Sequence, residues 1–308
     1  MPHSLTMDAI ALSLIIAGAL LHASWNLLAK KASGGAAFVW LAGCVTSISA
    51  LPCAFFAWLY YAPNLTWLSG LVIAGSALIH LLYALTLQTG YQRSEFSVVY
   101  PLARGTGPLF SVLAAIILLD ERPGLFAMLA ICCILAGILL ISDGWRSCTK
   151  LWQKPRSATD ENSVSQTRTY AGIVWGCLTG ITIAAYTVVD AWAIRQLGLP
   201  PLLYYALSLP LRSLLLAPKA LAQPRLLQQQ WRSNRSYIIG VGLLSPLAYL
   251  LALFALQRAP LYYIAPSREL SMLAGLLIAA YFLGERLTLS RLLGVSFMVS
   301  GVCLLASR

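Results

Sequence analysis

The chain has 308 residues, of which 59% are hydrophobic and only 10% are charged. Soluble domains are roughly 45–50% apolar and about 25% charged, so this composition excludes a soluble enzyme. The mean hydropathy of +0.77 indicates that lipid is the main solvent. The net charge is +11, but the basic residues lie between apolar blocks, so we expect them to set the orientation in the membrane and not to bind nucleic acid.

The sequence contains apolar stretches long enough to cross about 30 Å of hydrocarbon, which takes roughly 20 helical residues. In chain order they are 8–29, 36–60, 68–89, 96–119, 124–142, 170–193, 201–220, 237–257, 261–283 and 289–306. Residues 143–169 form the only long polar segment, which we interpret as a basic linker. The first span is followed at once by another, which argues against a cleaved signal peptide. We therefore predict an all-α membrane protein with ten transmembrane helices.

Cysteine and histidine spacing does not point to a metal site or a disulfide framework. The seven cysteines fall mainly within apolar spans, and neither a Cys-x-x-Cys pair nor a histidine cluster occurs. A phosphate-binding loop of the type Gly-x-x-x-x-Gly-Lys-Ser/Thr is also missing from the sequence. We expect no cofactor, no metal and no enzymatic activity, and we expect the driving energy to come from a gradient or from exchange.

The two sides of the linker resemble each other. Matching residues recur 164 positions apart: Glu121 and Glu285, Arg122 and Arg286, Gly137 and Gly301. With a one-residue gap the match extends to the pairs Pro101 and Pro266, and Arg104 and Arg268, and a further shift places His80 opposite Tyr249. We predict repeats at 8–142 and 170–306, joined by the linker at 143–169. Because each repeat has an odd number of spans, the second is inverted relative to the first.

Specific motifs carry a resemblance to a known family. They are His22-Ala23-Ser24-Trp25-Asn26 at the end of the first span, Leu119-Asp120-Glu121-Arg122, Leu283-Gly284-Glu285-Arg286, and the glycines Gly294 and Gly301. In these features the chain resembles the EamA-type branch of the drug/metabolite transporter superfamily. The resemblance implies a ten-helix carrier with two five-helix repeats around a central cavity, which moves small metabolites such as amino acids, sugars or phosphate esters. Ala130 stands where the second repeat has Gly294, so close helix packing is less expected there.

Loop charge predicts the orientation. Fourteen Lys and Arg residues lie on the side of the linker and four on the side of the termini. We therefore expect a multi-pass protein of the cytoplasmic (inner) membrane with the linker in the cytoplasm and both termini outside, whereas the resemblance implies cytoplasmic termini for most members.

Two arginines lie deep within spans at positions that the repeat relates. Arg104 is about 13 Å from the start of its span and Arg268 about 10 Å, so neither reaches the surface easily. One interpretation is a cationic pair that binds carboxylate or phosphate through planar hydrogen bonds. The alternative is a structural ion pair with Glu269, Glu121 or Glu285.

Helical spacing selects further candidates for a substrate-binding wall, which mix polar and aromatic side chains. They are His22, Trp25, Asn26, His80, Tyr83, Tyr100 and Tyr249. For the histidines the alternative is a hydrogen bond to a neighbouring helix, and for Trp25 and the tyrosines it is packing. Arg212 is left out, because it is expected to extend toward the helix end at Lys219.

Asp190 and Glu269 are candidates for proton coupling, since a carboxylate at low dielectric can hold a proton near neutral pH. Glu269 follows Arg268 directly and could instead pair with a neighbouring helix. Glu121 and Glu285 are expected to fix helix ends by ion pairs.

The sequence thus predicts a secondary transporter, working by alternating access, of a small polar metabolite that is anionic or amino-acid-like. The expected partners are this substrate and membrane lipid, without nucleic acid, and the expected state is a monomer. A lipid-carrier flippase, which needs a lateral opening, and a non-transporting scaffold or membrane enzyme remain alternatives. Substrate identity, direction of transport and coupling ion stay open.

Overall fold

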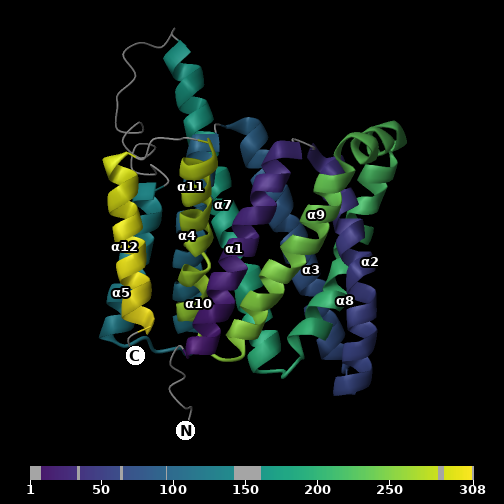
Figure 1. Cartoon of the computed structure of the whole chain (residues 1–308), viewed down its shortest axis with the longest axis horizontal. Helices are drawn as coiled ribbons and strands as arrows, with labels where there is room; N and C mark the ends of the chain where they lie inside the picture. The colour runs from purple at the N-terminus through teal and green to yellow at the C-terminus, as the bar shows by residue number, and fades with distance from the viewer. Residues whose placement is uncertain are drawn as a thin grey trace. The chain divides into compact units, whose positions relative to one another are not determined.

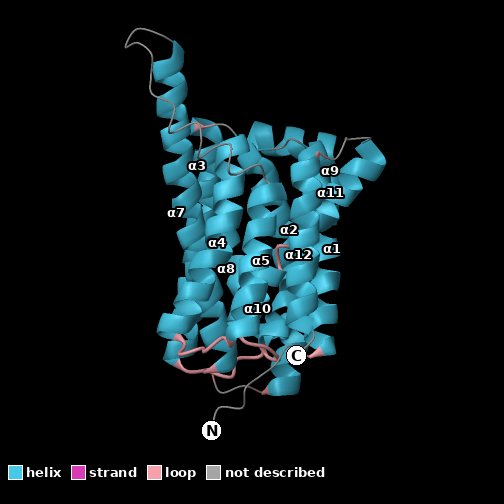
Figure 2. Cartoon of the chain, turned by 90° about the vertical axis from the view of Figure 1, so that its left-hand side faces the viewer, coloured by secondary structure: helices cyan, strands magenta, loops and turns pink. Residues whose placement is uncertain are grey.

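The computed structural model describes residues 8–32, 35–62, 65–94, 96–141, 161–283 and 288–306. All regular elements in these segments are helices, as Figure 2 shows. They are α1 (Ala9–Ala32), α2 (Gly35–Tyr61), α3 (Trp67–Arg93), α4 (Phe96–Leu118), α5 (Leu125–Ile141), α7 (Glu161–Arg195), α8 (Pro201–Leu221), α9 (Pro224–Leu256), α10 (Leu261–Ser267), α11 (Leu270–Leu283) and α12 (Leu289–Ala306). The predicted all-α fold is confirmed, and residues 143–160 of the predicted linker lie outside the described segments.

Six of the described helices are long and apolar enough to cross a membrane. They are formed by Ala9–Ala29, Gly35–Tyr61, Trp67–Arg93, Val98–Leu118, Arg168–Arg195 and Pro224–Leu256. α5 and α12 are shorter apolar helices. Large apolar side chains such as Phe56, Ile117 and Leu214 are 67%, 75% and 66% exposed. Lipid is the solvent in which so much apolar surface is stable, so the chain is a multi-pass membrane protein.

The described helices differ from the predicted spans in three places. α7 begins at Glu161, earlier than predicted, because hydropathy marks only the part of a helix that lies in lipid. α9 begins at Pro224 and leaves helical geometry at Asn234 (φ −125°, ψ 17°), so the predicted span at 237–257 is the part after this kink. The span predicted at 261–283 is divided into α10 and α11 at Arg268 and Glu269.

The chain forms two compact units. Unit 1 contains the described residues of Leu82–Val188 and Pro260–Arg308, and unit 2 contains those of Asp8–Leu81 and Val189–Ala259. Each unit therefore combines segments from both predicted repeats, and both α3 and α7 contribute to both units. The predicted boundaries of the repeats stay a prediction.

In unit 1, α5 and α12 lie side by side through close glycine contacts (Figure 1). A Cβ atom at Gly294 would lie 2.9 Å from the carbonyl oxygen of Gly137, and one at Gly301 would lie 2.8 Å from that of Ala130. Seven residues forward along α12 therefore correspond to seven residues backward along α5, so the helices are antiparallel. Ala130 is accommodated because its partner on α12 is a glycine.

The α5/α12 contact relates the two repeats geometrically. Adding the repeat offset of 164 to Gly137 gives Gly301, and subtracting it from Gly294 gives Ala130. When each residue is replaced by its counterpart in the other repeat, the contact between Gly137 and Gly294 becomes the contact between Gly301 and Ala130. An antiparallel contact that maps onto itself in this way is what an inverted repeat produces.

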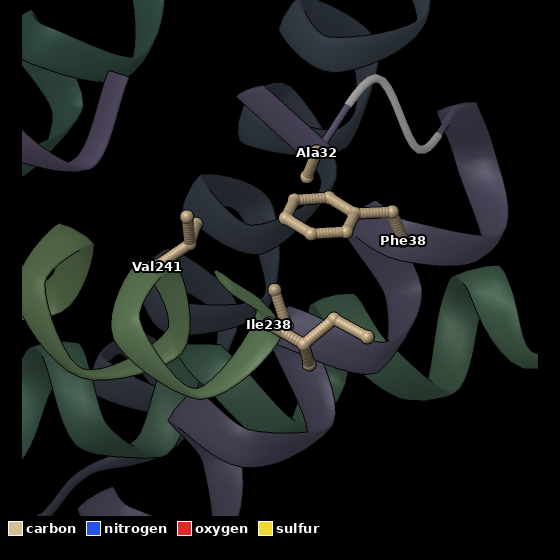
Figure 3. Close-up of a cluster of buried hydrophobic side chains, with 5 residues drawn as sticks. Ala32, Phe38, Ile238 and Val241 are labelled. Atoms are coloured by element: carbon tan, nitrogen blue, oxygen red, sulfur yellow. The ribbon is translucent and has the colours of Figure 1, made fainter. Parts of the chain in front are cut away.

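In unit 2, α1, α2 and α9 enclose a cluster of buried apolar side chains: Ala32, Phe38, Ala42, Ile238 and Val241. Figure 3 shows Phe38 lying between Ala32, Ile238 and Val241. Polar side chains add bonds between these helices: Thr46 Oγ1 donates to the Gly242 carbonyl at 2.7 Å. Such interhelical hydrogen bonds stabilise helices in lipid, where no water competes for them.

Candidate functional site

Arg104 is carried by α4, which packs against a stripe of glycines on α7. Gly172, Gly176 and Gly180 recur at every fourth residue and so share one face of α7. A Cβ atom at Gly176 would lie 2.7 Å from the Leu102 Cβ atom. Only small residues permit so close an approach of two membrane helices. The stripe therefore fixes the position of α4 and with it that of Arg104.

Arg104 binds Glu269 within unit 1. Its Nη1 atom donates to both carboxylate oxygens, at 3.3 Å to Oε1 and 3.2 Å to Oε2, and its guanidinium lies 5.5 Å from the centre of the Tyr100 ring. Strong charge-assisted bonds measure about 2.7–2.9 Å, and the firmest arginine–carboxylate pairs use two nitrogens. The Arg104–Glu269 contact is therefore a long contact through one nitrogen. This is the ion pair that the sequence left open as the alternative to ligand binding.

Glu269 lies at the break between two helices. α10 ends at Ser267, and α11 begins at Leu270. Pro266 has no N–H to continue the helical pattern, and the Glu269 N–H donates at 3.1 Å to the carbonyl three residues earlier. The Ser267 hydroxyl is fully buried and has no hydrogen-bond partner among the described residues. Ser267, Arg268 and Glu269 therefore lie at the break, between the end of α10 and the start of α11.

Tyrosines surround these charges in unit 1. Arg104, Glu269 and Arg268 lie within electrostatic range of Tyr83 on α3. The ring of Tyr83 meets that of Tyr186 edge-on, with centroids 5.6 Å apart. Arg104, Tyr100, Tyr83, Arg268 and Glu269, which the sequence selects on three separate spans, thus belong to one cluster.

A second polar cluster in unit 2 surrounds Asp190, which is fully buried. Its Oδ1 atom accepts from Ser76 Oγ at 2.6 Å and from Tyr204 OH at 2.5 Å. Its Oδ2 atom accepts from Tyr249 OH at 2.5 Å and lies 3.1 Å from His80 Nε2. This carboxylate therefore joins side chains of α3, α8 and α9 to α7.

His80 and Tyr249, which the repeat pairs with each other, meet at the same oxygen of Asp190. Their rings are perpendicular, with centroids 5.3 Å apart. The interhelical hydrogen bond considered as the alternative for His80 is thus present. Sequence reasoning missed Ser76 and Tyr204 as partners of this carboxylate.

Arg212 on α8 extends in a different direction from the one expected. Its Nη2 atom donates at 3.2 Å to Ser208, one turn toward the start of α8, and its guanidinium lies 5.4 Å from the centre of the Tyr205 ring. The predicted extension toward Lys219 is therefore wrong, because the Cα–Cβ bond of a helical residue points toward the helix start. The spacing of Tyr204, Ser208 and Arg212 at every fourth residue is the sequence signal that could have found this face.

The candidates on α1 lie in unit 2. The rings of His22 and Trp25 meet edge-on at 4.8 Å, and Asn26 donates to the His22 carbonyl at 2.8 Å. Trp25 also packs against the cluster around Phe38, while its indole Nε1 is buried without a partner among the described residues. A substrate-binding role for these three residues stays a prediction.

Glu121 fixes a helix end, as expected, but through backbone bonds. Its carboxylate accepts from the N–H groups of Leu261 at 2.9 Å and Tyr262 at 3.0 Å, which open α10. Arg122 pairs with the exposed Asp120. Glu285 and Arg286 lie outside the described residues. Among the described residues there is also no group of three or more His, Cys, Asp or Glu side chains that could hold a metal ion.

The EamA-like transporter family model matches residues 9–143 and 170–307 of this chain. The chain belongs to the EamA-like transporter family. It is therefore a membrane transporter of the drug/metabolite type, as its motifs indicate. The family model matches the chain twice, once on each side of the polar segment.

Solved structures share the fold. Matches extend to 28 chains, among them a crystal structure described only as that of a protein, with a TM-score of 0.71 and 13% identity over 96% of this chain and 95% of the other. At this identity the likeness concerns the fold alone. No curated protein matches the chain.

Proposed function

We propose that this EamA-like protein is a secondary active transporter, working by alternating access, of a small polar metabolite that is anionic or amino-acid-like. We place it in the cytoplasmic membrane. The proposal takes Arg104 and Arg268 as the groups that bind the anionic end of the substrate, with Tyr83 and Tyr100 shaping the site.

The long Arg104–Glu269 contact carries this proposal. A substrate carboxylate or phosphate that offers two oxygens to two guanidinium nitrogens would bind Arg104 in better geometry than Glu269 does. The Ser267 hydroxyl, which has no partner in the part of the chain that the structure describes, lies next to Arg268 and offers a further donor to such a ligand. Interrupted helices commonly form substrate sites in secondary transporters, and the break between α10 and α11 has this character.

Displacement of Glu269 supplies a coupling step. Without substrate, Glu269 neutralises Arg104, and when a substrate anion takes its place the freed carboxylate is left in a low dielectric. Glu269 is our coupling candidate and would carry the proton in this state. Substrate anion and proton would then cross the membrane together.

Unit 2 supplies the second coupling candidate. This candidate is Asp190, whose two oxygens contact four neighbours, with His80 Nε2 lying 3.1 Å from Oδ2. His80, Tyr249, His22, Trp25 and Asn26 remain in the proposed substrate-binding set.

Transport by purified protein in liposomes tests the proposal. Candidate substrates are amino acids, dicarboxylates and phosphate esters, selected first by their ability to raise the melting temperature. We expect Arg104→Gln and Arg268→Gln to abolish saturable uptake, and Glu269→Gln to retain substrate binding while uptake loses its dependence on a proton gradient.

The control is Arg122→Gln, which makes the same change in charge at a side chain that is 85% exposed. It should transport like the wild type. Normal uptake by both the Arg104 and the Arg268 variants would exclude the anion site, and proton-dependent uptake by the Glu269 variant would exclude the coupling step.

A further inference from the structure

Arg212 in unit 2 is a partly buried cation whose hydrogen-bonding capacity is only partly used among the described residues. Its Nε atom is buried and has no partner among the described residues, and its single hydrogen bond goes to the neutral Ser208 hydroxyl. No described carboxylate lies within 4.0 Å of its guanidinium. Arginine within a membrane span is costly unless a partner compensates its charge.

The acids of unit 2 are engaged elsewhere. The Asp8 carboxylate accepts a hydrogen bond from the Ala11 N–H, and its Oδ2 atom lies 2.8 Å from Arg258 Nη1. Asp190 is surrounded by the two tyrosines, the serine and the histidine described above. Neither acid supplies a direct hydrogen-bond partner for Arg212.

The surroundings of Arg212 hold its guanidinium in a defined plane. Ser208, one turn earlier on α8, is fully buried, and the ring of Tyr205, which is 8% exposed, lies under the cation. Tyr205 in turn contacts the ring of Tyr249, with centroids 5.1 Å apart. A planar guanidinium fixed by an aromatic ring is the usual arrangement for two-pronged recognition of carboxylate or phosphate.

We infer that Arg212, Ser208 and Tyr205 form an oxyanion-binding subsite that takes a carboxylate or phosphate group. The Nε atom and a terminal nitrogen donate to two oxygens of the ligand, and the Ser208 hydroxyl donates to one of them. The inference deepens the proposed function, on which its role in transport rests, by adding a binding group in unit 2. The oxyanion belongs either to the soluble substrate or to a lipid phosphate.

Thermal unfolding of the purified protein in detergent tests the subsite without knowledge of the substrate. Wild type, Arg212→Gln and Arg212→Lys are compared, with Arg235→Gln as the control because Arg235 is an exposed arginine of α9 in the same unit. Without ligand we expect Arg212→Gln to melt at or above the wild-type temperature, since it removes a partly buried charge that has no ionic partner among the described residues. Arg235→Gln should be unchanged.

The same four proteins are then titrated with succinate, with inorganic phosphate and with phosphatidylglycerol. We expect at least one probe to stabilise the wild type and Arg235→Gln, with an apparent affinity at least tenfold weaker in Arg212→Gln and intermediate in Arg212→Lys. Stabilisation by the soluble anions assigns the subsite to substrate, and stabilisation by phosphatidylglycerol alone assigns it to lipid.

Three results would overturn the inference: a clearly lower melting temperature of ligand-free Arg212→Gln, stabilisation that does not depend on Arg212, or no stabilisation by any probe. Failure here is distinguishable from failure of the proposed function. If Arg212→Gln responds to all three probes like the wild type while Arg104→Gln does not transport, only the subsite is lost, whereas normal transport by the Arg104 and Arg268 variants removes the proposed function itself.

Discussion

Asp190 is the residue on which the polar network of unit 2 depends. The hydroxyls of Ser76, Tyr204 and Tyr249 all donate to its carboxylate, and it is fully buried. An asparagine in its place would offer one oxygen, and its NH2 group would face donors. Each unsatisfied buried donor costs about 1–3 kcal/mol.

We therefore expect Asp190→Asn to lower the melting temperature strongly and to abolish transport. Tyr204→Phe removes one donor only and should cost less. Asp120→Asn is the control, because Asp120 is 81% exposed. Equal melting temperatures of Asp190→Asn and the wild type would contradict this account of the network.

Asp8 allows a prediction about pH, because it lies outside the membrane-spanning part of α1. The Ala11 N–H donates to its carboxylate at 2.6 Å and, together with Arg258, holds the pKa of Asp8 below its ordinary value of 3.8. A lowered pKa contributes stability above the ordinary value, and this contribution is lost as the pH falls through the folded-state pKa.

Asp8→Ala should accordingly reduce stability by about 1 kcal/mol at pH 7, the usual effect of losing a helix cap. The difference from the wild type should shrink as the pH falls below 3.8. Melting curves across this range measure it. A difference that stays constant with pH would show that the charge of Asp8 contributes nothing.

The site illustrates what residue types and spacing can predict. Arg104, Arg268, His80 and Tyr249 could be selected because polar side chains are rare in apolar spans and recur between the repeats. Asp190 and Glu269 could be selected as well, but which carboxylate each side chain meets could not be predicted, because that depends on helix packing. The direction of Arg212 was predicted wrongly for a related reason: distance from a helix end does not reveal the direction of a side chain.

At the scale of helices, the glycine contact between α5 and α12 determines how closely they pack. A Cβ atom at Gly294 would lie 2.7 Å from Ile141 Cγ1 and 2.9 Å from the Gly137 carbonyl oxygen. The backbone atom cannot move aside without shifting the helix. Overpacking of this kind typically costs about 1–3 kcal/mol.

Gly294→Ala should therefore lower the melting temperature. Gly75→Ala on α3 is the matched control, since a Cβ atom there meets nothing within 4 Å and alanine favours helix. It should leave the melting temperature unchanged or raise it. Similar shifts in the two variants would show that the close contact with α5 is unimportant.

Most helices could be predicted because a run of apolar residues is itself the requirement for crossing lipid. The break between α10 and α11 could not, although Pro266 was recognised. A proline only weakens a helix, and α4, which contains Pro101 and Pro108, is continuous. Tertiary contacts at each proline decide whether the helix continues.

At the scale of the whole molecule, orientation in the membrane is the main prediction that the fold leaves open. An inverted repeat can insert in either direction, and the bias of positive loop residues decides between the two. The count of 14 against four predicts that the linker lies in the cytoplasm.

We expect a periplasm-active reporter fused after Arg308 to be active, and a cytoplasm-active reporter at the same position to be inactive. A fusion within the linker provides the control, with the opposite pattern. Activity of the C-terminal fusion only in the cytoplasm would reverse the orientation and place this chain with most members of its superfamily.

The composition of the two units also constrains biosynthesis. Arg104 meets Glu269 across 165 residues of chain, and His80 meets Asp190 across 110. During translation the first five helices therefore enter the bilayer with an arginine and a histidine whose partners have not yet been made. Neither core can close until the ribosome has supplied the later helices, so premature termination would leave an inserted chain whose arginine and histidine lack these partners.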